Sequence, residues 1–310
     1  MKTKPLTFLL ALTFLFLFSG SVFGQEEVKK EYHENGKLKS EIPYNGLATF
    51  WYRTGEKYHE VHYKNGKMEG LSTRWDKDGK KESQVHYKNG NAEGLETVWG
   101  KSGRKVVEKH YKNGKKDGVA TFWYKNGQVE TESHYKDGKL NGLLSRWYPN
   151  GKKMSEIPYI DGKENGFATS WYISGEKRQE ENYKDGKVNG VQTWWYKSSK
   201  KEEERYYKNG KESGLRTKWF ENGKKDMETY YKKGKKSGLR TEWRWDNGKK
   251  HMEAHFKDGN LDGPYTDWHS NGHKANEGHY KDGKEDGLWT EWSEIGDRID
   301  ERHFVDGKEQ

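Results

Sequence analysis

The 310-residue sequence contains no cysteine, which excludes disulfide bonds, thiolate metal sites and attachment of a lipid to a cysteine. Only 30% of the residues are hydrophobic and half of those are aromatic, so aliphatic side chains for a compact core are scarce. Disorder is also disfavoured, because 14 Trp and 20 Tyr exceed what a disordered chain carries. An elongated repeat protein fits both facts, since each repeat packs only on its neighbours.

The sequence also lacks an apolar run long enough to cross a bilayer, which takes about 20 residues. The run from Leu6 to Phe18 is shorter, two lysines precede it, and small residues follow it. This arrangement is typical of a signal peptide. We therefore expect residues 1–24 to be cleaved near Gly24 and Gln25, and the remaining protein to be soluble and exported.

Two aromatic positions recur at a spacing of 24 residues, with one spacing of 25 between Trp243 and Trp268. The Trp column comprises Trp51, Trp75, Trp99, Trp123, Trp147, Trp171, Trp195, Trp219, Trp243, Trp268 and Trp292. The Tyr column, half a unit later, comprises Tyr63, Tyr87, Tyr111, Tyr135, Tyr159, Tyr183, Tyr207, Tyr231, Phe256, Tyr280 and Phe304. These columns predict a leading partial repeat over residues 25–46 and an array of about eleven repeats over residues 47–310.

Each unit is predicted to form two strands and two turns. Alternating residues such as Leu71, Thr73 and Trp75 favour a strand before each column Trp, and a second strand precedes each column Tyr. Asn-Gly and Asp-Gly pairs between them supply the positive φ that tight turns need. No segment has a helical apolar stripe. The predicted fold is all-β: one elongated, single-layer antiparallel sheet of tandem hairpins.

The register depends on the turn between the Trp and Tyr columns. Two central residues would place the columns on opposite faces, whereas three with a glycine bulge would place them together. We favour three residues, and we expect the rings to form stacked ladders down the sheet. Pro43 and Pro158 lack an N–H and predict a strand end or bulge before the Tyr column. Ser199 replaces the usual turn glycine and predicts strain or another turn type.

At these residues the sequence resembles the bacterial variant of the MORN repeat family. "YKNGKMEGLSTRW" carries the family pattern of an aromatic, an Asn-Gly-Lys turn, a further glycine and an aromatic strand. An acidic residue before the Tyr column also matches, although the unit of 24 residues is about one longer. The resemblance implies a hairpin sheet and a non-enzymatic scaffold that binds proteins or, in some members, membrane lipids. Many bacterial members of this variant are labelled antitoxins.

Recurring acidic and histidine positions do not predict chemistry. The Glu column, from Glu41 to Glu301, places carboxylates about 10 Å apart, at or beyond the useful separation for glycoside hydrolysis. We expect it to pair with lysines or backbone N–H groups. Seven His precede the Tyr column on different hairpins, too far apart to share a metal easily. No catalytic residue, metal or cofactor is predicted, although a pH-sensitive His row stays open.

Lysines recur directly after the Tyr column and again three residues later. They predict a comb of positive charge along one edge, which either attracts anions or merely keeps the sheet edge soluble. Nucleic acid is an improbable partner for an exported chain. The candidate anion contacts are Lys112, Lys115, Lys136, Lys139, Lys184, Lys187, Lys208 and Lys211.

A run of additional aromatic residues marks the middle of the array. Five units in succession carry a ring directly after the column Trp, and two further rings precede it. Strand alternation would place the residues after Trp on the face opposite the Trp column. They predict either a partner-binding surface or simple packing on the sheet. The candidate partner-binding residues are Phe122, Tyr124, Tyr148, Tyr172, Trp194, Tyr196 and Phe220.

Together these features predict an exported, non-catalytic scaffold, with a protein as the expected partner. A cell-wall or glycan-binding module is the alternative, because choline- and glucan-binding repeats are also hairpin arrays rich in Trp, Tyr and Gly. Their units are shorter and lack this Glu column. Association of the lysine comb with an anionic lipid surface is a third hypothesis. The oligomeric state is not predicted.

Overall fold

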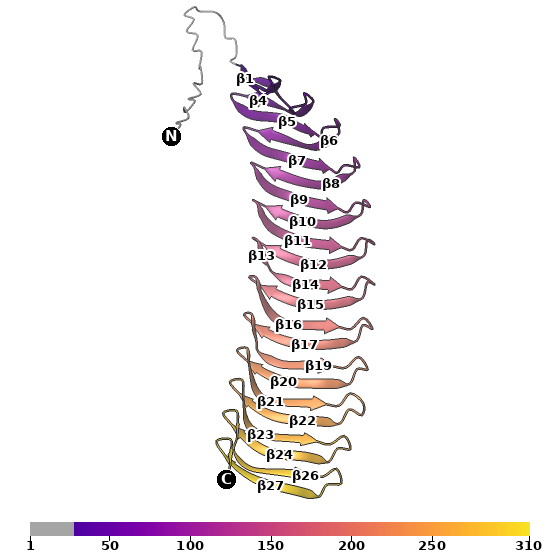
Figure 1. The fold of residues 1–310 in the computed structure, drawn as a ribbon, viewed down its shortest axis with the longest axis vertical. Helices are drawn as coiled ribbons and strands as arrows, with labels where there is room; N and C mark the ends of the chain where they lie inside the picture. The colour runs from indigo at the N-terminus through magenta and orange to yellow at the C-terminus, as the bar shows by residue number, and fades with distance from the viewer. Residues whose placement is uncertain (1–27) are drawn as a thin grey trace, which may run out of the picture.

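The computed structural model describes residues 28–310, which form one sheet of 28 strands and contain no helix. Figure 1 shows a long, narrow stack in which the strands run across the long axis and the turns follow its two edges. No second layer covers either face of the described sheet. The predicted all-β, elongated, single-layer array is therefore confirmed. The predicted signal peptide over residues 1–24 lies outside the described residues.

Each unit contributes one strand for each column. The strands of the Tyr column are β2 (Leu38–Pro43), β4 (Lys57–Lys64), β6 (Lys81–Lys88), β8 (Lys105–Lys112), β10 (Val129–Lys136), β12 (Lys153–Ile160), β15 (Lys177–Lys184), β17 (Lys201–Lys208), β20 (Lys225–Lys232), β22 (Lys250–Lys257), β24 (Lys274–Lys281) and β27 (Arg298–Val305). The strands of the Trp column are β3 (Gly46–Trp51), β5 (Lys67–Trp75), β7 (Asn91–Trp99), β9 (Lys115–Trp123), β11 (Lys139–Trp147), β14 (Gly166–Trp171), β16 (Lys187–Trp195), β19 (Gly214–Trp219), β21 (Lys235–Trp243), β23 (Asn260–Trp268) and β26 (Gly287–Trp292). The sheet also contains β1 (Val28–Tyr32), β13 (Lys163–Glu164), β18 (Lys211–Glu212), β25 (Lys284–Glu285) and β28 (Lys308–Glu309).

Strands pair antiparallel with the strands next to them in the sequence. β13 and β14 are two parts of one strand, interrupted at Asn165, and both pair with β12. The pairs β18 and β19, and β25 and β26, are interrupted in the same way. Each hairpin is thus stabilised by its immediate neighbours, as in other repeat proteins.

Two kinds of turn alternate along the chain. The turn after the Tyr column has two central residues with positive φ, such as Asn65 at 51° and Gly66 at 72°. This is the type I′ geometry that suits the twist of a hairpin. The turn after the Trp column has three central residues, and in one of them Gly79 N–H donates to the Asp76 carbonyl over 3.0 Å. The predicted three-residue turn with a glycine bulge is confirmed.

The two aromatic columns nevertheless lie on opposite faces, so the expectation of a shared face is wrong. Directly opposed residues of a ladder point to the same side. Arg74 is paired with Ser83. Trp75 is paired with Lys81, so Glu82 is an extra residue in β6. This second bulge cancels the effect of the three-residue turn. We call the two sides of the sheet the Trp face and the Tyr face.

The column Trp rings do not stack on one another, which corrects the predicted ladders. Equivalent residues of successive repeats are two strands, or about 9.6 Å, apart, which exceeds the range of ring contacts. Lysines fill the space between them. The Lys177 ammonium lies 5.1 Å from the centre of the Trp195 ring and 2.8 Å from Glu180. Ion pairs of this kind engage most of the Glu column, as predicted: Glu60, Glu108, Glu156, Glu180, Glu204, Glu228, Glu253, Glu277 and Glu301.

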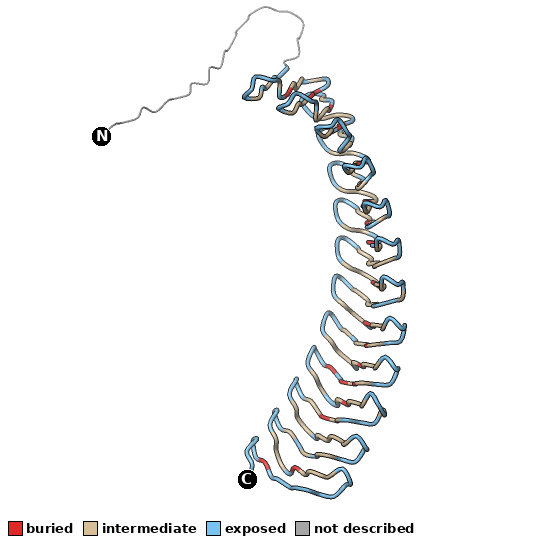
Figure 2. Tube along the Cα trace, turned by 45° about the vertical axis from the view of Figure 1, so that its right-hand side comes forward, coloured by how far each residue is buried: buried red, intermediate tan, exposed pale blue. Residues whose placement is uncertain are grey.

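The core is a thin row along the middle of the sheet, mainly on the Tyr face. Ala48, Val61 and Ala254 are fully buried there, and Thr side chains are buried on the Trp face. Figure 2 shows the buried positions as short, separate patches along the strands, while the turns are exposed. Near the centre the row becomes charged: burial opposes ionisation of Glu203, but Arg205 and Arg216 hold its pKa below the usual range.

Units that depart from the repeat pattern in sequence have an irregular structure at the same place. Ser199 adopts a left-handed φ of 62° in an otherwise ordinary three-residue turn, which confirms the predicted strain. The spacing of 25 residues produces a longer turn, closed by hydrogen bonds between Arg244 and residues 248 and 249. Pro43 ends β2. Pro158 lies near the end of β12, opposite the break between β13 and β14, so both prolines occupy the predicted kinds of position.

Candidate functional site

The ring directly after the column Trp begins the three-residue turn, because each strand ends at the Trp. The face on which these rings lie therefore stays a prediction. Four of them donate a hydrogen bond to the backbone carbonyl of the next column Trp, which ties each repeat to its neighbour. The distances are 2.7 Å for Tyr124, 2.9 Å for Tyr148, 2.8 Å for Tyr172 and 2.8 Å for Tyr196. Burial raises the pKa of Tyr124 and Tyr196.

The other aromatic candidates lie in different places. Phe122 and Trp194 come one position before the column Trp and therefore lie on the Tyr face. The Arg205 guanidinium is 4.8 Å from the centre of the Trp194 ring. Phe220 begins a turn but has no hydroxyl to donate. The role of the seven aromatic residues in partner binding stays a prediction.

The edge formed by the three-residue turns, here called the Trp edge, is held together by side chains. Asn126 Nδ2 donates to the Pro149 carbonyl over 2.8 Å. Asn222 Nδ2 donates to the Trp245 carbonyl over 3.1 Å, and Lys224 Nζ donates to another carbonyl of that turn. Polar side chains of this edge thus form hydrogen bonds that join successive repeats.

The edge formed by the two-residue turns, here called the lysine edge, is different. Two lysines flank most of these turns and are direct cross-strand partners, as Lys136 and Lys139 are. Like charges placed opposite each other destabilise a sheet. The predicted anion contacts lie here as four exposed pairs: Lys112 with Lys115, Lys136 with Lys139, Lys184 with Lys187, and Lys208 with Lys211. Within residues 28–310 these eight ammonium groups form no ion pair.

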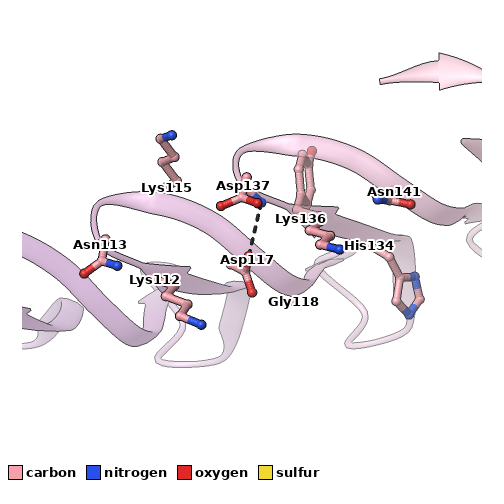
Figure 3. Close-up of a pocket in the computed structure, with 10 residues that line it drawn as sticks. Lys112, Asn113, Lys115, Asp117, Gly118, His134, Lys136, Asp137 and Asn141 are labelled. Carbon is pink, nitrogen blue, oxygen red and sulfur yellow. Dashed lines mark hydrogen bonds between the residues drawn. The ribbon is translucent and has the colours of Figure 1, made fainter. Parts of the chain in front are cut away.

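Carboxylates near the lysine edge bond the backbone instead. Asp117 Oδ2 accepts the N–H of Asp137 over 3.1 Å, as Figure 3 shows. Glu93 Oε2 accepts the N–H of Asn113 in the same way over 2.7 Å. Each carboxylate supports the left-handed first residue of the next turn.

The Trp face is hollowed next to the lysine edge. A hollow of about 680 Å³ is lined by residues that include His134 and Lys136, which Figure 3 shows beside it. A second hollow, of about 710 Å³, is lined by residues that include Tyr230 and Lys232. These are the equivalent positions four repeats later. We use the word groove for these two hollows together with the equivalent positions of the other repeats on the Trp face.

A glycine in each unit shapes this groove. Gly142 has a φ of 119°, and a Cβ at this position would lie 2.9 Å from the Cβ of His134. The pairing of β10 with β11 shifts at the same place, between Ser133 and Tyr135. Such a bulge bends the strands. Glycine therefore permits both the backbone conformation and the close approach of the neighbouring side chain.

An apolar side chain lies on the Trp face four residues before each column Trp, and all of these side chains except half-buried Val119 are exposed. Leu215 and Leu239 are 39% and 43% exposed and line the second hollow. Phe167 is 68% exposed. We call this set the aliphatic row: Leu47, Leu71, Leu95, Val119, Leu143, Phe167, Val191, Leu215, Leu239, Pro264 and Leu288. This row was not predicted from the sequence, although the position is apolar in all eleven units and lies on the face away from the core.

The histidines before the Tyr column are cross-strand partners of the aliphatic row. His110 Nδ1 lies 3.0 Å from the Val119 carbonyl, and His134 Nδ1 lies 3.0 Å from the Leu143 carbonyl. A carbonyl only accepts, so Nδ1 carries the proton. In the neutral ring Nε2 is then an acceptor for an outside group.

Comparison with family models identifies the repeat. A model described as the MORN repeat variant matches residues 28–45, 44–65, 68–89, 116–137, 140–161, 188–209, 212–233 and 261–282, which together cover more than half of the chain. The chain belongs to the MORN repeat variant family. It is therefore a MORN repeat protein, a non-catalytic repeat module, and the resemblance proposed from the sequence is confirmed. A search of the curated proteins gave no match.

Solved structures add little to this assignment. The structure titled TcdB2-TccC3-Cdc42 is 11% identical over 87% of the MORN repeat protein and 18% of its own chain, with a TM-score of 0.18. The structure titled TcdB2-TccC3-TEV is 12% identical over 86% and 15%, with a TM-score of 0.19. The chain thus spans less than a fifth of these solved chains. Such TM-scores do not establish a common fold.

Neither a metal cluster nor a membrane-spanning helix is found in the described part of the MORN repeat protein. Among residues 28–310, no three acidic or histidine side chains gather as a metal ion would need. The same residues include no helix with the length and apolarity needed to cross a membrane. The groove between the aliphatic row and the lysine edge is the candidate site that the geometry provides.

Proposed function

We propose that this MORN repeat protein is an exported scaffold that binds a protein partner along its groove. The aliphatic row carries this proposal, because it places exposed apolar side chains at one position in successive repeats. Exposed apolar patches mark interaction sites on soluble proteins. The unpaired lysines beside it favour a partner with acidic residues.

Repetition gives such a groove its strength. A partly exposed Leu offers only a small apolar area, so contact with one repeat gains little free energy. A long partner that contacts several repeats adds these gains without paying again for association. Hydrogen bonds between successive repeats at the Trp edge keep the repeats at a fixed spacing. Affinity is therefore expected to grow with the length of partner that the groove holds.

Export is supported by the first residues of the sequence. Two lysines, the apolar run from Leu6 to Phe18 and the small residues after it have the order of a signal peptide. The partner is accordingly expected outside the cytoplasm. Fractionation of cells that produce the full chain, with N-terminal sequencing of the protein, tests this. An intact N-terminus in the cytoplasmic fraction would contradict the proposal.

The binding proposal is tested with matched variants. Leu215→Ser/Leu239→Ser alters the aliphatic row, whereas Ile173→Ser/Ile295→Ser alters exposed apolar residues of the Trp edge, which are 55% and 78% exposed. Affinity purification from the cells that produce the protein, followed by mass spectrometry, compares the two. We expect partners to be lost only with the first variant. Equal retention by both variants would contradict binding in the groove.

Glycan binding is a second candidate, because Tyr206 and Tyr230 in the groove are 40% and 51% exposed. Sugar-binding sites of hairpin arrays use such rings. Purified cell-wall polysaccharide tests this alternative directly. Retention of the protein that free sugar reverses, and that Tyr206→Ala/Tyr230→Ala abolishes, would favour the glycan over a protein partner.

A further inference from the structure

The spacing of the aliphatic row restricts the conformation of a partner, if a partner binds in the groove as the proposed function requires. Equivalent residues of successive repeats are two strands apart, which is about 9.6 Å. A polyproline II chain rises about 3.1 Å per residue and has three residues per turn, so it repeats after about 9.3 Å. We infer that the groove binds an extended, acidic polypeptide in polyproline II conformation, with an apolar residue at every third position.

An α-helix fits the row less well. Seven helical residues span about 10.5 Å, which differs from the repeat spacing by about 0.9 Å. A straight helix also rotates about 20° per seven residues relative to a fixed line. Over five repeats the accumulated shift approaches half a repeat. The polyproline II chain returns to the same side after each triplet, and its shift over five repeats is only about 1.5 Å.

Hydrogen bonding favours the same occupant. A polyproline II chain has no internal hydrogen bonds, so its N–H and C=O groups need partners when water is displaced. The groove offers ammonium donors from pairs such as Lys208 and Lys211, and acceptors from Nε2 of His110 and His134. A helix has already satisfied these backbone groups and gains nothing from them.

Charge supplies the third requirement. In a polyproline II chain one residue of each turn faces the aliphatic row. The other two residues of the turn point toward the walls of the groove and toward solvent. Acidic residues there meet a lysine pair in most repeats, and they relieve the mutual repulsion of the two lysines. Binding is therefore expected to weaken as salt screens these contacts, while the apolar contribution persists.

Synthetic peptides test this inference with the purified full-length protein. A triplet peptide of Leu, Glu and Pro that spans about five repeats is compared with a helix-forming peptide of equal length, charge and leucine content. A scrambled version of the triplet peptide is the third probe. We expect the triplet peptide to bind most tightly by fluorescence anisotropy, and its circular dichroism to keep the polyproline II signature when bound.

Variants locate the peptide in the groove. Leu215→Ser/Leu239→Ser should weaken triplet binding about tenfold, since two partly buried contacts are lost. Lys208→Gln/Lys211→Gln should weaken it and reduce its salt dependence. Lys125→Gln/Lys200→Gln removes the same charge from the Trp edge and should leave binding unchanged.

The outcomes separate the inference from the proposed function. Tighter binding of the helical peptide, sensitive to the Leu215 and Leu239 variant, would overturn the extended conformation and leave the groove as a protein-binding site. Equal binding of the scrambled peptide would show that charge alone acts, which also overturns the inference. Lack of binding by every peptide overturns it too. The proposed function itself would be contradicted only if the aliphatic-row variant and the Trp-edge variant retained partners equally in the affinity purification.

Discussion

The two edges of the sheet are built from similar hairpin turns but use their polar groups differently. At the Trp edge, Tyr148 and Tyr172 donate to carbonyls of the following repeat over 2.9 and 2.8 Å. At the lysine edge, Lys136 and Lys139 face each other, are exposed and form no ion pair within the described part of the chain. The Trp edge thus uses its polar groups in hydrogen bonds between repeats, whereas the lysine edge carries charges without ion-pair partners in residues 28–310.

This difference separates stability from recognition in a protein whose described residues enclose no interior. Bonds between repeats at the Trp edge fix the spacing of the array, so substitutions there should lower stability. The lysine pairs contribute repulsion rather than cohesion. Their loss should cost little stability but should change what the surface attracts.

The largest expected effect comes from removing the Trp-edge hydroxyls. Tyr148→Phe/Tyr172→Phe/Tyr196→Phe removes three hydrogen bonds and leaves three backbone carbonyls without these donors. Each loss should cost about 1 kcal/mol, so the free energy of unfolding should fall by about 3 kcal/mol. Urea unfolding followed by Trp fluorescence measures the change.

The control for this variant is Tyr44→Phe, whose ring is 55% exposed at the start of the lysine edge. It should leave the unfolding curve unchanged. If the triple variant unfolds with the same midpoint as the unaltered protein, the hydroxyl bonds do not hold the repeats together. The Trp edge would then contribute no more to stability than the lysine edge does.

The second prediction concerns the one three-residue turn in residues 28–310 that has serine in place of its glycine. Ser199 has a φ of 62°, and a left-handed conformation costs a non-glycine residue about 1 kcal/mol. Ser199→Gly should therefore raise the free energy of unfolding by about that amount. Ser198→Gly alters the preceding turn residue, which does not need positive φ, and should not stabilise the protein. A gain from Ser198→Gly alone would contradict the strain at Ser199.

The third prediction is the counterpart at the lysine edge. Lys233 has a φ of 53° at the position where the other two-residue turns carry Asn or Asp. Asn tolerates this conformation better, so Lys233→Asn should stabilise the protein by about 0.5 kcal/mol. Thermal unfolding measures the gain. Lys232→Asn, one residue earlier in β20, is the control, because extended backbone gives Asn no advantage there.

Local features of the fold were predictable from the sequence, because turn chemistry acts within a few residues. Asn-Gly and Asp-Gly pairs located the turns, and the Glu column was expected to pair with lysines. The faces were not predictable, since a single extra residue such as Glu82 reverses them. Spacing alone also suggested stacked rings, whereas lysines such as Lys177 occupy the space between Trp rings.

The candidate site was predicted in part. The lysine pairs were found because their spacing repeats with the turns. The aromatic candidates were interpreted as a surface, but the hydroxyls of residues such as Tyr124 are used inside the array. The aliphatic row was overlooked because an alternating Leu, Thr and Trp looks like one buried strand face. Only the bend at glycines such as Gly142 shows that the Leu position lies in a groove.

The last prediction compares one substitution at two rows of lysines, and its expected effect per substituted residue is the smallest. Lys112→Gln/Lys136→Gln/Lys184→Gln/Lys208→Gln removes one member of four repelling pairs, which should stabilise the protein by about 0.2 kcal/mol per pair or more. Lys105→Gln/Lys153→Gln/Lys177→Gln/Lys201→Gln removes the same charge from lysines that pair with the Glu column. That variant should lose about 0.3 kcal/mol per pair.

The signs differ because the first row lacks carboxylate partners within residues 28–310 and the second row has them. Urea unfolding at low and high salt measures both, and both effects should shrink as the Debye length falls. If both variants changed the free energy of unfolding in the same direction at low salt, net charge rather than the local partner would set the effect of each substitution.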